Sequence, residues 1–96
     1  MPQASYTKDP AEILDYVINW REKDYLEDDE DINTSAWEIS PSGLSKVTDG
    51  YENVSGKCTI WVSGGSGQQS YTCTNTITTD KGRTCVRAIT IRVADR

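Results

Sequence analysis

Residues 57–93, which decide the fold class, are KCTIWVSGGSGQQSYTCTNTITTDKGRTCVRAITIRV. Three runs within them, 57–63, 70–79 and 84–93, alternate apolar with polar residues and are rich in Thr, Val, Ile and aromatic side chains. A period of two residues is typical of a half-buried strand and not of a helix. We therefore predict three consecutive antiparallel strands that form a meander.

The connections between the three runs predict how the strands pair. A three-residue loop at 80–82, with its glycine in the left-handed conformation, places Ile77 opposite Cys85. The six-residue, glycine-rich connection before the second run places Val62 opposite Tyr71. One face then carries the side chains that we expect in the core, which are Cys58, Ile60, Val62, Tyr71, Cys73, Ile77, Cys85, Ile89, Ile91 and Val93.

Length and charge limit the classes of protein to which the chain can belong. Its 96 residues suffice for one small domain, and its net charge is -5. Residues 1–48 hold 11 acidic and 4 basic residues, whereas residues 49–96 hold 4 acidic and 6 basic ones. Because phosphate binding needs clustered Lys and Arg, we do not expect a nucleic acid partner. No apolar run is long enough for a transmembrane helix, and the start MPQASYTKDP lacks the apolar centre of a secretory signal, so we expect neither a membrane partner nor export.

The three cysteines and the absence of histidine make a metal or cofactor site an unfavourable interpretation. In the predicted registers the closest cysteine pair is diagonal, which is farther apart than a disulfide usually spans. We therefore expect free, buried thiols, as in a reducing compartment. No Cys-x-x-Cys spacing is present, and we predict no metal site and no cofactor.

The first half of the chain is less decisive than the second. Residues 1–10 are polar and contain two prolines, so we predict a short N-terminal arm, with one β-sandwich domain over residues 11–96. The segment Asp9–Glu12 resembles a helix start, but Ile13–Trp20 alternates like a strand, and we favour the strand, followed by a helical turn around residues 22–26.

An acidic run, Glu27-Asp28-Asp29-Glu30-Asp31, follows this segment. The spacing of its acids starts like a calcium loop, but Thr34 and Ser40 occupy the positions that need Gly and Glu, which excludes an EF-hand. Looser calcium binding stays an open alternative. The simplest interpretation is a solvated loop that discourages edge-to-edge strand pairing.

The remaining segments complete the predicted fold. We expect strands at Ile32–Ser40, at Leu44–Thr48 and at Tyr51–Val54, with Trp37 as the central aromatic residue of the core. With Ile13–Trp20 and the three runs of the second half, this makes about seven short strands. This number of short strands, separated by turn signals, is typical of an all-β, immunoglobulin-like or fibronectin-like antiparallel sandwich.

Catalytic patterns are missing from the sequence. It has no histidine and no Gly-x-Ser-x-Gly element, and the glycine-rich loop at 64–67 lacks the Lys-Ser/Thr ending of a phosphate loop and leads into a strand. A hydrolase that uses paired carboxylates is the weakest hypothesis, since nothing indicates a lined cleft. We expect a protein that is not an enzyme.

The arrangement of scaffold residues resembles a family of small virion proteins of tailed bacteriophages that have an immunoglobulin-like fold, some of which are fibre-to-tail adaptors. The resemblance extends from about Lys8 to Arg96. It is carried by Lys8-Asp9-Pro10, Ile13-Leu14-Asp15-Tyr16, Asn19-Trp20, Asp31-Ile32, Ser35-Ala36-Trp37, Ser42-Gly43-Leu44, residues 59–65, residues 71–79, Gly82-Arg83-Thr84 and residues 89–93. The long acidic segment at 21–31 and the three cysteines depart from the pattern.

The resemblance implies a non-enzymatic virion structural protein, an adaptor that attaches a fibre or another component to the tail. It implies other virion proteins as partners, several copies in a symmetric assembly, synthesis in the host cytoplasm and a place in the virion tail. Two alternatives stay open: a capsid decoration protein, and an immunoglobulin-like module that binds carbohydrate or protein, with Trp61 and Tyr51 as stacking surfaces. The residues that we expect to contact partners are Tyr6, Asp28, Asp29, Glu30, Asp31 and Trp61.

Overall fold

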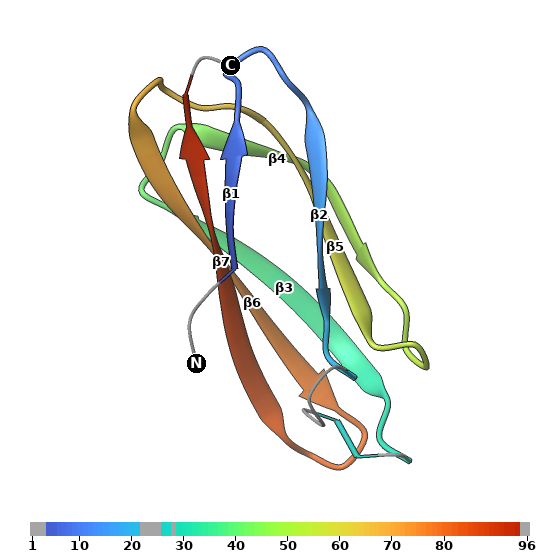
Figure 1. Cartoon of the computed structure of the whole chain (residues 1–96). Coiled ribbons are helices and arrows are strands. Elements are labelled where there is room, and N and C mark those ends of the chain that lie inside the picture. Colours follow the sequence, from blue (N-terminus) through green and yellow to red (C-terminus); the bar gives the residue numbers. More distant parts are fainter. Residues whose placement is uncertain (1–3, 22–25, 28, 95–96) are drawn as a thin grey trace.

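The structure, a computed structural model, describes residues 4–21, 26–27 and 29–94 and contains seven strands within them. The strands are β1 (Ala4–Lys8), β2 (Leu14–Asn19), β3 (Ile32–Ser40), β4 (Leu44–Tyr51), β5 (Lys57–Gly64), β6 (Gln69–Thr79) and β7 (Thr84–Val93). They form a four-stranded sheet in the order β1-β7-β6-β3 and a three-stranded sheet in the order β2-β5-β4 (Figure 1). The predicted all-β sandwich is confirmed. The described residues contain no helical segment with the length and hydropathy that crossing a bilayer requires.

The hairpin of β6 and β7 has the predicted register. Ile77 lies opposite Cys85, Cys73 lies opposite Ile89, and Gly82 has a φ of 82° in the loop between the strands. A three-residue loop with a left-handed glycine leaves little freedom in how two strands pair, so the sequence alone determines this register.

The predicted pairing of β5 with β6 is wrong. β5 is the central strand of the three-stranded sheet, where Val62 lies opposite Leu14 and Lys46, whereas β6 pairs with β3 and β7. The connection from β5 to β6 crosses from one sheet to the other, so the three runs do not form a meander. The four residues between the two strands, 65–68, are enough for this crossing. The alternation of apolar residues is the same in both arrangements.

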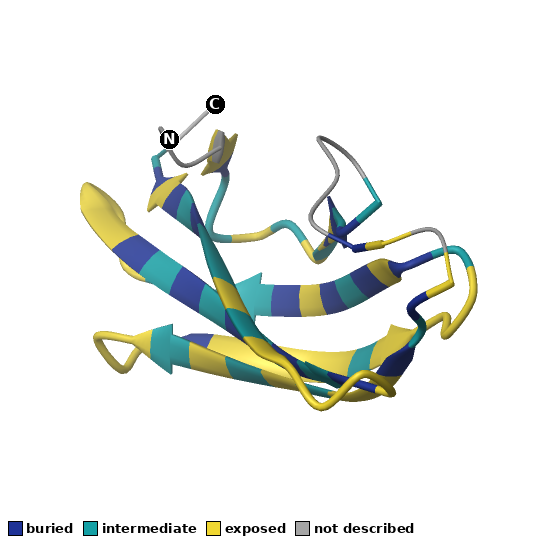
Figure 2. Cartoon of the chain, turned by 90° about the horizontal axis from the view of Figure 1, so that it is seen from below, coloured by how far each residue is buried: buried dark blue, intermediate teal, exposed yellow. Residues whose placement is uncertain are grey.

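Side chains from the inner faces of the two sheets fill the core. Figure 2 shows buried and exposed residues alternating along the strands of both layers. Nine of the ten residues that we expected in the core are buried, and Cys85 is partly buried. The three cysteines are free thiols, as predicted. The central aromatic residue is Trp20, which has no exposed surface, and not Trp37, which packs partly buried against the core from the edge strand β3.

The N-terminal segment belongs to the sandwich. Residues 4–8, within the segment predicted to be an arm, form β1 and pair in parallel with the C-terminal half of β7, with Lys8 opposite Val93. Figure 1 shows β1 beside β7 at the edge of the larger sheet. The hydrogen bonds of a helix start do form, since the Asp9 amide donates to Glu12 Oε1 and the Glu12 amide to the Asp9 carbonyl, but they close a turn into β2. The predicted strand at Ile13–Trp20 is therefore confirmed as β2, and the helical turn predicted at 22–26 lies, apart from Leu26, outside the described residues.

The fourth strand is longer than the prediction. β3 has the predicted bounds, but β4 continues through Gly50 to Tyr51, where we expected a turn and then a separate strand up to Val54. A bulge between Lys46 and Thr48 shifts the register of β4 against β5. The extra residue reorients the second half of β4, so the pair Asp49-Gly50 lies within a strand although it is a common turn signal.

Candidate partner-binding surfaces

The acidic segment binds the loop between β6 and β7. The Lys81 ammonium lies 2.8 Å from Asp29 Oδ2, and Arg21 Nη2 lies 3.1 Å from Asp31 Oδ1. Arg83 donates to both carboxylate oxygens of Glu30, with 2.8 Å between Nε and Oε2. The carboxylates of Asp29 and Glu30 therefore hold a loop about fifty residues away in the sequence, whereas that of Asp31 pairs with Arg21, close to the end of β2. The predicted solvated loop is wrong for Glu30, whose side chain is 0% exposed. Asp28 lies outside the described residues.

These contacts change the electrostatics of the segment. The Arg83 guanidinium and, more weakly, the Thr79 hydroxyl hold the pKa of Glu30 at about 2, although burial opposes this shift. The pKa of Asp29 is also lowered, because Lys81 donates to its carboxylate. Among the described residues no three acidic or cysteine side chains gather closely enough to hold a metal ion. The carboxylates of Asp29, Glu30 and Asp31 are thus each paired with a basic side chain of the same fold, and they do not form a patch of uncompensated negative charge.

Tyr6 has an internal contact. Its ring lies 4.8 Å from the ring of Tyr16, centroid to centroid, at an interplanar angle of 43°. Tyr6 comes from β1 in the larger sheet, whereas Tyr16 comes from β2 in the smaller one, so the pair joins the two layers at one side of the sandwich. Tyr6 keeps 38% of its surface exposed, so part of the residue is accessible to a partner.

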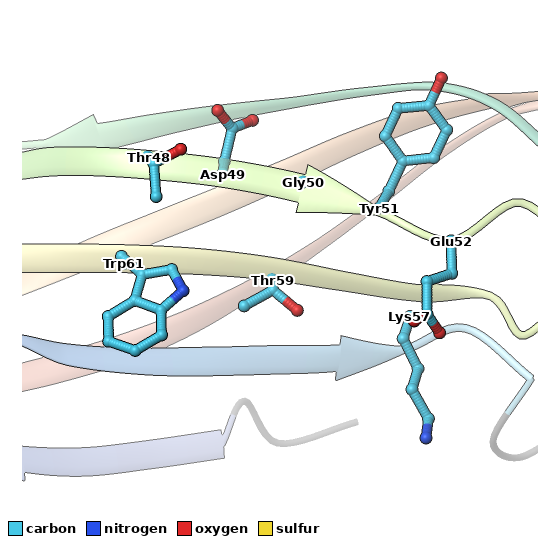
Figure 3. Close-up of a pocket in the computed structure, with 8 residues that line it drawn as sticks. All are labelled: Thr48, Asp49, Gly50, Tyr51, Glu52, Lys57, Thr59 and Trp61. Carbon is cyan, nitrogen blue, oxygen red and sulfur yellow. The ribbon is translucent and has the colours of Figure 1, made fainter.

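Trp61 lies on the outer face of the three-stranded sheet. It stands on the central strand β5, opposite Asp15 on β2 and Thr48 on β4, and is 40% exposed. A shallow groove next to it is lined by Thr48, Asp49, Gly50, Tyr51, Glu52, Lys57, Thr59 and Trp61. Figure 3 shows the indole on the side of β5 that faces β2, with Thr59 farther along the same strand. An aromatic side chain on a central strand, with no strand above it, is a surface that a partner can cover.

Tyr51 does not share this face with Trp61. Tyr51 lies opposite Cys58, whose side chain is buried, so its own side chain lies on the inner side of the smaller sheet, at the free edge of β4. Its hydroxyl donates to the Asn33 carbonyl at 2.8 Å and joins β4 to β3. Figure 3 shows the two rings turned in opposite directions. The stacking platform of Trp61 and Tyr51 that we considered for a sugar is therefore not formed.

The predicted contact residues occupy three separate positions. Asp29, Glu30 and Asp31 lie at the β6–β7 loop, Tyr6 lies on the edge strand β1, and Trp61 lies on the outer face of the smaller sheet. Of these residues, only Trp61 is exposed and makes no side-chain hydrogen bond, ion pair or ring contact with another described residue. The geometry therefore singles out the outer face around Trp61.

Two buried polar residues were missed by the sequence analysis. Asn75 has no exposed surface, accepts a hydrogen bond of 2.8 Å from Trp20 Nε1, and donates to Ser35 Oγ and to the Ala36 carbonyl. Its position between Cys73 and Ile77 in the alternation indicated that it faces inward. The second residue is Lys8, whose ammonium donates to the carbonyls of Asp9 and Gly64 at 2.9 and 2.8 Å. Burial lowers the pKa of Lys8, and no pattern in the sequence distinguished this lysine from a solvated one.

Comparison with solved structures supports the class of fold. The solution structure of the PKD domain from the KIAA 1837 protein superposes with a TM-score of 0.55 at 16% sequence identity, over 100% of this chain and 83% of that one. At this identity the likeness concerns the fold alone. Two facing sheets whose strands, β1 apart, pair in antiparallel fashion define, with this similarity, an immunoglobulin-like β-sandwich, as the spacing of the predicted strands indicated.

A family match identifies the chain more closely. The family described as podophage GP4 fiber-tail adaptor protein gp77 matches residues 8–92. The chain belongs to this family of phage fibre-tail adaptors, which confirms the resemblance found in the sequence. No curated protein matches the sequence.

Proposed function

We propose that this chain is a structural, non-enzymatic component of a bacteriophage virion that attaches a fibre or another component to the tail. The observation that carries the proposal is the family match over residues 8–92, which extends from the end of β1 almost to the end of β7. The match thus includes β2 to β6 and nearly all of β7, and not one short motif, which supports an adaptor role for this chain.

The contacts of the polar residues support a scaffold role. Glu30 is held by Arg83, and Asn75 is held by Trp20, so these buried polar groups bind to other parts of the same fold. Paired groups of this kind stabilise one arrangement of the two sheets. The exposed aromatic Trp61, in contrast, lies where it is available for docking.

The proposal includes the surroundings of the protein. Its partners are other virion proteins, of the tail, the fibre or the capsid, and we expect neither nucleic acid nor membrane among them. Several copies are arranged by the symmetry of the tail, since oligomeric assemblies of identical chains are mostly symmetric. The chain is made in the host cytoplasm and becomes part of the virion tail.

The direct test is to locate and count the chain in purified virions. Mass spectrometry with labelled reference peptides gives the copy number, and a cryo-EM reconstruction gives the position. We expect few copies, all at the tail. The absence of the chain from purified particles would overturn the proposal, and a large number of copies distributed over the capsid would indicate a decoration protein instead.

A further inference from the structure

The outer faces of the two sheets differ in chemistry. The four-stranded sheet presents mainly threonine from β6 and β7, and Val86 is its large exposed aliphatic residue. The three-stranded sheet presents Val17, 43% exposed, and Trp61, 40% exposed, with Ile13, 59% exposed, directly before β2. Exposed apolar side chains therefore concentrate on the smaller sheet. Such concentration marks a surface that binds another protein.

A carboxylate lies at the centre of this apolar surface. Asp15 stands between Ile13 and Val17 along the chain and directly opposite Trp61 across the sheet. Its side chain is exposed, and its carboxylate makes no hydrogen bond or ion pair with another described residue. This distinguishes it from Asp29, Glu30 and Asp31, each of which binds a basic side chain of the fold. Within the part of the chain that the structure describes, nothing neutralises the charge of Asp15, which is therefore available to a partner.

The pair of Asp15 and Trp61 is suited to a cationic side chain. Directly opposed residues on one face of an antiparallel pair have Cβ atoms about 5 Å apart, which is close enough for one group to contact both. An indole face attracts a guanidinium or ammonium group, and a carboxylate beside it pairs with the same charge. The aliphatic neighbours Ile13 and Val17 would bury the apolar stem of such a side chain.

The groove beside Trp61, which residues of β4 and β5 line, makes part of this surface concave. Gly50 lies opposite Thr59, and a Cβ atom added at Gly50 would meet no other atom within 4 Å. Gly50 does not have a positive φ, so its backbone does not require glycine. The missing side chain leaves a hollow beside the indole, into which a partner side chain can insert.

From these observations we infer that the outer face of the three-stranded sheet, around Asp15, Val17, Gly50, Thr59 and Trp61, is the docking surface for a virion protein that presents a basic side chain on an apolar surface. The basic group stacks on Trp61 and pairs with Asp15, while an apolar neighbour occupies the hollow over Gly50. The inference rests on the proposed adaptor function and specifies the chemistry of its partner. A carbohydrate is disfavoured because the flanking side chains Ile13 and Val17 are aliphatic and Tyr51 lies on the other side of the sheet.

The test is the incorporation of purified variants into tails assembled without the chain. Wild-type protein is measured first, and failure of the wild type to bind overturns the proposed function itself. If the wild type binds, Trp61→Ala should weaken binding about tenfold or more, as expected for a central aromatic contact. Asp15→Asn should weaken it roughly threefold to tenfold and reduce its dependence on salt concentration.

Matched variants on the other sheet serve as controls. Glu38, on β3, is another exposed acid without an ion pair among the described residues, and Val86, on β7, is another exposed valine. Glu38→Gln and Val86→Ala should bind within about twofold of the wild type, as peripheral substitutions do. Equal losses for Asp15→Asn and Glu38→Gln would overturn the inference.

The variant Gly50→Val tests the effect of a filled hollow on binding without a loss of stability. Valine is favoured in strands and meets open space at this position, so the melting temperature should not fall. The added side chain fills the hollow, and binding to the tails should weaken severalfold while the fold is unchanged. Unchanged binding of both Gly50→Val and Trp61→Ala would overturn the inference.

Cross-linking identifies the partner group. A photoreactive residue in place of Val17 should label a tail or fibre protein next to an arginine or lysine, and Asp15→Arg should be rescued by an acidic substitution of that partner residue. Labelling only at a surface without a basic residue would overturn the inference. Array screening gives a further outcome that would overturn the inference. This outcome is a glycan whose binding requires Trp61, together with incorporation into tails that does not require Trp61.

Discussion

The Arg83 guanidinium binds both carboxylate oxygens of Glu30, whose side chain is completely buried at the end of the sandwich. This pair joins the acidic segment to the β6–β7 loop, and Thr79 Oγ1 donates a third hydrogen bond to the same carboxylate at 2.6 Å. Removal of one partner from such a pair leaves a buried charge without compensation, which is strongly unfavourable. The contact is therefore more important for stability than the exposed pair of Lys81 and Asp29 beside it.

We first predict that Arg83→Gln lowers the melting temperature by several degrees, whereas Lys81→Gln changes it little. Thermal unfolding followed by circular dichroism checks this. The two variants remove one positive charge each from the same loop, so they differ mainly in the burial of the acid that is left. Equal melting temperatures for the two variants would show that Glu30 is not held as described.

The pH dependence of stability should report the same contact. The pKa of Glu30 is lowered from its ordinary value of 4.5 to about 2. Its contribution to stability is thus fully present above about pH 4.5 and is lost as the pH falls toward 2. We expect the melting temperature to decrease over this range, and the difference between wild type and Arg83→Gln to narrow, because protonation removes the charge that Arg83 compensates. A constant difference across the range would contradict this account.

The second prediction concerns the polar contact in the core. Asn75→Ala leaves Trp20 Nε1 and the Ala36 carbonyl without their buried partner, and it should cost about 1–3 kcal/mol for each group that stays unsatisfied. Urea unfolding with a constant m-value measures the change. Thr76→Ala, on the opposite face of the same strand, is the control and should be nearly neutral.

Trp20 and Trp37, which differ in burial, allow a sharper comparison. Trp20→Ala should cost about 3–5 kcal/mol, because the side chain is fully buried at the centre of the core. Trp37 is partly buried, so Trp37→Ala should cost less. The reverse order would mean that Trp37, as the sequence suggested, is the central aromatic residue.

The third prediction concerns the attachment of β1. The ring contact between Tyr6 and Tyr16 joins β1 to the other sheet, and its loss in Tyr6→Ala should destabilise this edge by about 1 kcal/mol. Hydrogen exchange measured by NMR should show faster exchange of the β1 amides, with the β6 amides almost unchanged. Ser5→Ala, at an exposed position of the same strand, should change neither. Equal acceleration in β1 and β6 would mean that β1 does not open separately.

The fourth prediction uses the free thiols. Cys58 and Cys73 have no exposed surface, and burial raises the pKa of both, that of Cys73 to about 11. A thiol reagent should therefore modify the partly buried Cys85 first, and the other two only when the protein unfolds. Mass spectrometry after timed modification of the folded protein gives the order. Early modification of Cys73 would contradict its placement in the core.

The elements that local rules determine were predictable from the sequence. The three-residue loop at 80–82 fixed the β6–β7 register, and the alternation of apolar residues identified the inward faces of β5, β6 and β7. Alternation does not specify which strand lies alongside, and for this reason β5 was assigned to the wrong sheet. The five residues of β1 are too few and too polar to indicate a strand without knowledge of the free edge of β7.

Residues of the candidate binding surface were predictable only where the local sequence pattern of a single residue indicated exposure. Trp61, an aromatic residue among threonines on an outward face, was identified from the sequence and is exposed. Its relation to Asp15 depends on the pairing of β2 with β5, two strands about forty residues apart, and no local pattern contains this pairing. The acidic run was misinterpreted for the same reason, since the bases that bind Glu30 and Asp29 lie in a distant loop.

The parallel pairing of β1 with β7 has a mechanical consequence for the adaptor role that we propose. Ala4 lies opposite Ile89 and Lys8 lies opposite Val93, so the chain enters β1 and leaves β7 at opposite ends of the paired segment. Tension applied between these two ends would load all hydrogen bonds of the pair at once, in shear, and would not open them one after another. A domain pulled in this direction withstands a larger force than one whose terminal strands separate one hydrogen bond at a time. This property suits the proposed attachment of one virion component to another.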